Sequence, residues 1–94
     1  MKKVYVLMNS WHTDSNGSDF GIVGIFLSKE NAIAKMKECV ADEIANDFDL
    51  YDENGKPLES TVVEEDELSW CAYTDDEYLM NSCEYKITEE YIYE

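Results

Sequence analysis

Hydrophobic positions form a continuous run near the start of the chain, follow a helical spacing further on, and alternate with polar positions near its end. Residues 4–8 are β-branched, aromatic or aliphatic, which favours a strand covered on both faces or nearly so. A second apolar stretch, 20–27, follows a polar segment whose asparagine-glycine pair at 16–17 is typical of a turn. The two stretches predict a β-hairpin with a long polar tip. Gly21 and Gly24 indicate a bulge or a close backbone approach in its second strand.

A helix is predicted over residues 29–47. Ser28 is a suitable N-cap, and Glu30 falls in the first turn, where the helix dipole favours an acid. The acids at Asp47 and Asp49 oppose the dipole at the other end, so the C-terminal boundary is poorly defined. The apolar side chains recur at helical spacing on one face, and they are Ile33, Met36, Val40, Ile44 and Phe48.

The middle of the chain allows two interpretations. Residues 60–67 could begin a helix, because Ser60 or Thr61 can serve as its N-cap and the acids that follow suit a first turn. They could equally begin a strand, because residues 61–63 are β-rich. Residues 67–73 are predicted as a strand.

The C-terminal segment, residues 83–93, alternates strongly. Tyr85, Ile87, Tyr91 and Tyr93 share one parity, which is typical of a strand. Glu89 and Ile92 interrupt the pattern, so we expect a bulge or a sheet edge there.

The predicted order is a hairpin, a long helix, an acidic middle and two C-terminal strands. This order is typical of an α+β fold, with an antiparallel sheet and one main helix packed on one face. The length of 94 residues fits a single domain over 1–94.

Charge is distributed unevenly. The net charge is −15, but residues 1–41 hold five lysines and four acids, whereas residues 42–94 hold two lysines and eighteen acids. The chain has no arginine, the usual residue for bidentate phosphate contacts. Direct nucleic-acid binding and attachment to an anionic membrane are therefore disfavoured. A basic partner, a metal ion and simple solubility stay open as reasons for the acidity.

The cysteines and the N-terminus bear on location. The chain has an odd number of cysteines, and no two of them are close in sequence: Cys39, Cys71 and Cys83. This predicts reduced thiols and a cytoplasmic protein. The apolar run after the two N-terminal lysines is too short for a signal peptide. No segment approaches the length of a membrane span, so we expect no membrane association.

Candidate chemistry is sparse. Aligning Gly55 with the glycine of an EF-hand loop places Leu50 and Thr61 at the terminal ligand positions, where neither can serve. Three cysteines and His12 match a zinc-site count, but no pair has the ligand spacing. The acidic surroundings would raise the pKa of a thiol and so oppose a reactive thiolate. We therefore expect no enzyme activity, no cofactor and no metal site.

Acids and aromatic rings gather in one segment. If the rings are core residues, the acids are only a solvated face; if some rings are exposed, the segment is an interface, because tyrosine and tryptophan are favoured hot-spot residues. The predicted partner-binding patch consists of Glu64, Glu65, Asp66, Glu67, Trp70, Tyr73, Asp75, Asp76, Glu77 and Tyr78.

Three stretches, "KKVYVL" at 2–7, "GIFLSKENAIAKM" at 24–36 and "YKITEEYIYE" at 85–94, resemble those of short uncharacterised bacterial and phage proteins. The resemblance covers about half the chain. It implies a strand, a return strand, a helix after Ser-Lys-Glu and a tyrosine-bearing final strand, and it implies no activity. In size, charge and lack of catalytic motif, the chain also resembles acidic phage inhibitors of CRISPR and restriction enzymes.

Two functional hypotheses follow. In the first, the chain is a non-catalytic inhibitor from a phage or mobile element that binds a basic, nucleic-acid-binding protein by charge mimicry. In the second, it is an accessory or immunity-type protein that binds one specific partner, and its acidity serves only solubility. A homodimer through the tyrosine-rich final strand is a further expectation.

Overall fold

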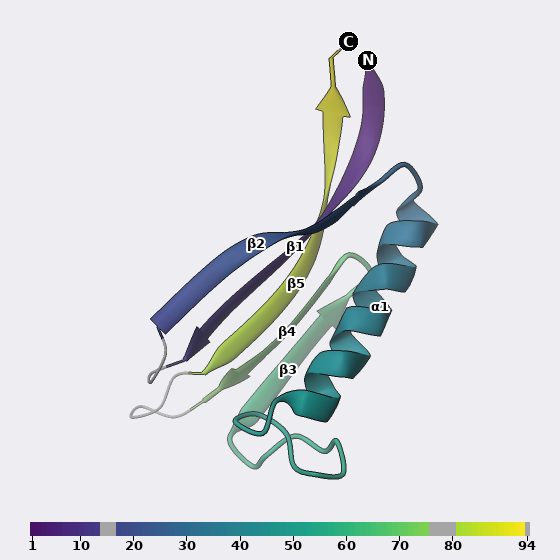
Figure 1. The fold of residues 1–94 in the computed structure, drawn as a ribbon. Coiled ribbons are helices and arrows are strands. Elements are labelled where there is room, and N and C mark those ends of the chain that lie inside the picture. Colours follow the sequence, from purple (N-terminus) through teal and green to yellow (C-terminus); the bar gives the residue numbers. More distant parts are fainter. Residues whose placement is uncertain (14–16, 76–80, 94) are drawn as a thin grey trace.

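A computed structural model describes residues 1–13, 17–75 and 81–93, and it confirms the α+β class (Figure 1). Of the turn predicted at 16–17, Asn16 lies outside the described residues, and Gly17 has the positive φ of 81° that favours glycine. The elements in chain order are β1 (Lys2–Thr13), β2 (Gly17–Phe26), α1 (Lys29–Asn46), β3 (Thr61–Asp66), β4 (Ser69–Thr74) and β5 (Ser82–Ile92).

The five strands form one antiparallel sheet in the order β2-β1-β5-β4-β3. The two terminal strands, β1 and β5, are therefore neighbours in the middle of the sheet, and β2 and β3 form its edges (Figure 1). Residues 61–66 are a strand, which decides between the two interpretations of the acidic middle.

The glycines of β2 mark a bulge, as predicted. Leu7 pairs with Gly24 and Met8 pairs with Ile22, so Val23 is one extra residue in β2. Gly24 also allows a close approach, because the Phe26 ring lies over it: a Cβ at Gly24 would sit 3.0 Å from Phe26 Cε2.

β5 pairs with β1 without interruption from Lys2 opposite Ile92 to His12 opposite Ser82. The pairing of β5 with β4 stops at Lys86. Glu89 and Ile92 therefore lie where β5 has lost one neighbour, and their break in the pattern marks a sheet edge and not a bulge.

α1 begins as predicted, because the Ser28 hydroxyl accepts a hydrogen bond from the Asn31 N–H at 3.2 Å. The helix ends at Asn46, and Asp47 is its C-cap. An acid at this end of a helix faces the negative end of the helix dipole, so Asp47 opposes extension of the helix. Burial also raises the pKa of Asp47, and the Glu43 charge raises it further. The prediction that Phe48 belongs to the apolar helical face is wrong, because Phe48 lies beyond the end of the helix and is 65% exposed.

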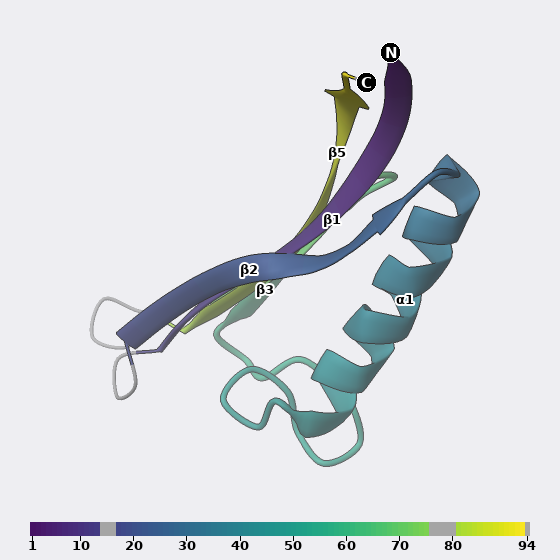
Figure 2. The ribbon, with the colours of Figure 1, turned by 45° about the horizontal axis from the view of Figure 1, so that its top comes forward.

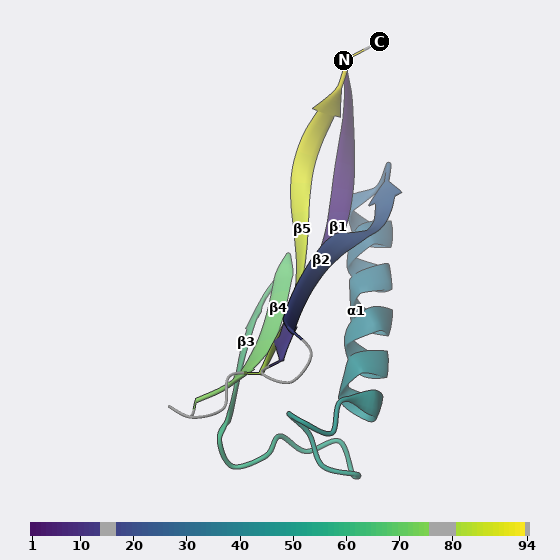
Figure 3. The same ribbon diagram turned by 60° about the vertical axis from the view of Figure 1, so that its left-hand side comes forward.

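α1 packs against the sheet through Ala32 and Met36, which meet Leu7 and Ile87 in one buried cluster. A second cluster forms around Trp70 near the C-terminal end of the helix, and its buried members are Leu50, Tyr51, Trp70, Ala72 and Cys83. The helix lies on one side of the sheet in all three ribbon views (Figures 1, 2 and 3). Its main contacts are with β1, β2 and β5, so it covers that face only in part.

Gly24→Ala is expected to destabilise the protein by about 1–2 kcal/mol, since the new methyl group must displace the packed Phe26 ring. Gly21→Ala is the matched control, because a Cβ there meets nothing within 4 Å. Urea denaturation measures both. Equal midpoints for the two variants would contradict this role of Gly24.

Candidate interaction surface

One face of the sheet is not covered by the helix (Figure 3). Strand register sorts its side chains into rows that cross the sheet from β3 to β2. One row runs from Glu64 through Cys71, Glu84 and Ser10 to Phe20. The next row runs from Asp66 through Ser69, Lys86 and Met8 to Ile22. The uncovered face is therefore acidic at its β3 edge and apolar at its β2 edge.

The acids of the predicted patch follow β3 and the turn after it. Alternation along the strand places Glu64 and Asp66 on the uncovered face and Glu65 on the helix side, opposite Trp70. All four acids from Glu64 to Glu67 are exposed, and so is Glu84 on β5. We name these five side chains the acidic rim: Glu64, Glu65, Asp66, Glu67 and Glu84.

Within the rim, Glu64 interacts with two side chains of β4. The Tyr73 hydroxyl donates to Glu64 Oε1 at 3.3 Å, and the Cys71 thiol donates to Glu64 Oε2 at 3.8 Å. The Glu64 charge is the largest cause of a raised pKa at Tyr73. Burial is the largest cause at Cys71, and the charges of Glu64 and Glu84 raise that pKa further. Both shifts have the sign that a concentrated negative potential produces.

Glu67 lies in the turn between β3 and β4. Its Oε1 lies 2.6 Å from Lys29 Nζ, and the hydrogen bond and charge of Glu67 raise the pKa of that lysine. Both side chains are well exposed, so this ion pair adds little stability. It connects the start of α1 to the β3–β4 turn.

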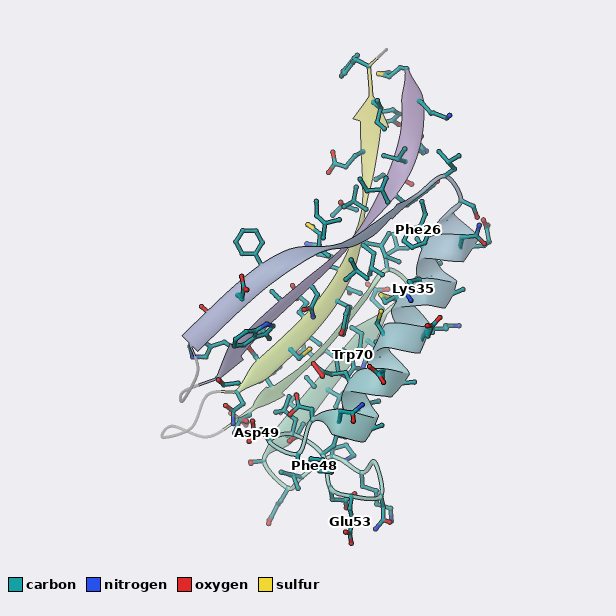
Figure 4. The ribbon with its side chains drawn as sticks, in the orientation of Figure 1. Phe26, Lys35, Phe48, Asp49, Glu53 and Trp70 are labelled. Carbon is teal, nitrogen blue, oxygen red and sulfur yellow. The ribbon has the colours of Figure 1, made fainter. Side chains whose placement is uncertain are left out.

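Trp70 does not belong to the exposed surface. The side chain is 3% exposed, and the centroid of its ring lies 6.2 Å from the centroid of the Tyr85 ring. Figure 4 shows Trp70 between the sheet and α1. The position on the helix-facing side of β4 explains why it is core and not an interface anchor.

The remaining residues of the predicted patch are dispersed. Tyr73 is half-buried on the uncovered face, and Asp75 is exposed just beyond β4. Asp76, Glu77 and Tyr78 lie outside the described residues. The prediction omits Glu84, although its alternation with Lys86 in the sequence places it on one face of the final strand.

A groove of about 360 Å³ runs between α1 and the β3–β4 hairpin. Met36, Val40 and Ile44 supply its apolar wall, and Glu65 and Glu67 lie on the opposite side. The groove is thus apolar within, with acids on the hairpin side and Lys37 on the helix side, which suits an apolar side chain with a basic group toward the hairpin.

The thiols show no sign of activation. Cys83 is 1% exposed and donates to Glu43 Oε1 at 2.7 Å, and burial strongly raises the pKa of its thiol. Burial also raises the pKa of Cys39. Among the described residues, no three His, Cys, Asp or Glu side chains are grouped to hold a metal ion. No helix in the described chain is long and apolar enough to cross a membrane.

Comparison with known proteins identifies no relatives: no family model matches the chain, and neither the curated proteins nor the solved structures contain a match. The resemblance to short bacterial and phage proteins therefore stays a prediction.

Glu64→Gln is expected to lower the pKa of Tyr73 toward its ordinary value, because the substitution removes the charge that raises it most. The pKa is measured by NMR titration of the tyrosine Cζ resonance. Asp66→Asn is the control, since Asp66 is not a cause of the Tyr73 shift. An unchanged Tyr73 titration in Glu64→Gln would contradict the contact.

Trp70→Ala is expected to destabilise the protein by about 3–5 kcal/mol, because it empties the centre of a buried cluster. Phe48→Ala, at an exposed position, should change stability by less than about 0.5 kcal/mol. Thermal unfolding followed by circular dichroism compares the two. A small effect of Trp70→Ala would mean that the ring is not part of the core.

Proposed function

We propose that this chain is a non-catalytic binding protein that captures a basic protein surface at its acidic rim. The observation that carries the proposal is the position of four consecutive exposed acids, Glu64 to Glu67, on an edge strand and its turn. Carboxylates on an edge strand alternate between the two faces of the sheet. A partner that wraps around the edge can reach the carboxylates on both faces. Glu84 extends the same potential across the uncovered face.

The spacing of the rim supports charge mimicry. Consecutive residues of a strand rise about 3.3 Å, so Glu64, Glu65 and Asp66 carry one charge per step of that length. One strand of duplex DNA carries one charge per about 3.4 Å of helix axis. A protein groove that holds a phosphate backbone with lysines and arginines therefore meets a comparable linear charge density at β3.

The partner class that fits this rim is a nucleic-acid-binding nuclease, such as a CRISPR or restriction effector. Its basic channel supplies lysines and arginines for the carboxylates, and occupation of the channel would block the nucleic acid. This role is that of a small cytoplasmic inhibitor encoded by a phage or mobile element. The absence of arginine makes the chain itself a poor ligand for phosphate.

The test is competition with duplex DNA for a panel of such nucleases at graded salt. Neutralising the rim with Glu64→Gln, Glu65→Gln, Asp66→Asn and Glu67→Gln should weaken binding at least about tenfold, equivalent to 1.4 kcal/mol. The wild-type affinity should fall steeply as salt rises.

A matched control removes four exposed acids elsewhere, with Asp49→Asn, Glu53→Gln, Glu59→Gln and Glu90→Gln. It has the same net charge as the rim variant and should bind nearly as well as wild type. Equal weakening of the two variants would show that only net charge matters. Failure to retain any nuclease at low salt would refute the proposal.

The alternative is an accessory or immunity-type protein that recognises one specific partner by shape, with acidity serving only solubility. The apolar groove beside Trp70 favours it, because such a groove accepts a particular side chain. Binding of this kind would depend weakly on salt and would survive neutralisation of the rim. Met36 and Trp70 are core residues, so the exposed groove residue Lys37 is the better site for a blocking substitution.

A further inference from the structure

The two edges of the sheet differ in charge. β3 carries Glu64, Glu65 and Asp66, whereas the chain has no ionisable side chain between Asp19 and Lys29. Along this neutral stretch four large apolar side chains are mostly exposed: Phe20 at 82%, Ile22 at 64%, Ile25 at 60% and Leu27 at 67%.

Free sheet edges are normally protected, because unpaired backbone N–H and C=O groups can recruit another strand. Charged side chains are one such protection, and the acids of β3 provide it. From Phe20 to Phe26, β2 has neither charge nor proline, and β1 is its only neighbour in the described sheet, so its other side is open (Figure 1). The bulge at Val23 is the one edge-protecting feature of this stretch. An apolar edge without charge or proline is otherwise suited to being covered by a strand.

We propose that a second copy of this chain covers it. Two copies would pair β2 antiparallel across a two-fold axis and so join their five-stranded sheets into one of ten strands. The acidic rims stay free in this dimer, so the inference does not depend on the proposed function.

The register of β2 supports a two-fold axis at Ile22. On β1, the partners of Phe20, Ile22 and Ile25 are Ser10, Met8 and Val6, which are evenly spaced because the bulge at Val23 absorbs one residue. All three β2 side chains therefore lie on the uncovered face. An axis at Ile22 places Ile22 opposite its copy and Phe20 opposite Ile25 of the second copy. Such aromatic and β-branched pairs stabilise antiparallel strands.

The charge distribution favours a second copy over a basic partner at this edge. β3 lies four strands away from β2, and in the joined sheet the two β3 strands stand at opposite ends. At about 4.8 Å per strand they are roughly 43 Å apart. That separation exceeds the Debye length of about 8 Å at physiological salt, so repulsion between the rims is screened. A basic partner, by contrast, finds no carboxylate between Asp19 and Lys29.

The first test is molecular mass by sedimentation over a range of concentrations. The wild type should reach twice 10.9 kDa, and Ile22→Lys should remain a monomer with an unchanged circular dichroism spectrum. Phe48→Lys is the control, because it adds the same charge at another exposed apolar position and should leave the dimer intact. A monomeric wild type at every concentration, or a dimeric Ile22→Lys, would overturn the proposal.

The second test is disulfide trapping in a background with Cys39→Ser and Cys71→Ser. Residues opposite each other in antiparallel strands have Cα atoms about 4.5–5.5 Å apart, within disulfide range. Ile22→Cys should therefore cross-link to its own copy. Ile25→Cys alone should not, whereas a mixture of Phe20→Cys and Ile25→Cys chains should. Cross-linking of Ile25→Cys to itself as efficient as that of Ile22→Cys would refute this register.

Discussion

The alternation of side chains along antiparallel strands is the constraint on which the rest of this structure depends. Residues that lie opposite each other on neighbouring strands point to the same face of the sheet. In the strand order β2-β1-β5-β4-β3, every second residue of each strand therefore belongs to rows of side chains that cross one face. On the helix side these rows supply the core residues Leu7, Trp70 and Ile87. On the uncovered side the rows in between run from carboxylates on β3 to apolar side chains on β2. One geometric rule thus sets the core, the acidic rim and the apolar edge.

The charge asymmetry of the chain becomes a spatial asymmetry through this strand order. β1 and β2 come from the half with a small net charge, and β3 comes from the half that holds eighteen acids. The acids of β3 have two effects that do not exclude each other. They oppose edge-to-edge pairing at that side of the sheet, and in the proposed function they face a basic partner. The proposed self-association and the proposed partner capture would therefore use opposite edges.

Local patterns predicted the helix, its Ser28 cap and the bulge beside Gly24, because each depends on residues close in sequence. The prediction that Phe48 lies on the apolar face of the helix is wrong, because periodicity does not show where the helix ends. The strand at 61–66 stayed ambiguous, because acids suit a helix start as well as an exposed strand. Whether Trp70 is buried depends on which face of β4 lies toward α1. That information, like the exposure of β2, comes from the long-range pairing of β1 with β5 and cannot be derived from local pattern.

The charge distribution predicts a negative potential that is concentrated at β3 and weak along β2 beyond Asp19. NMR relaxation of backbone amides by paired cationic and anionic nitroxide cosolutes measures this potential residue by residue. We expect strong enrichment of the cationic probe at the amides of Glu64 to Glu67 and of Glu84, with little preference at Ile22 to Ile25, beyond the Asp19 carboxylate. Equal enrichment along both edges would contradict this prediction.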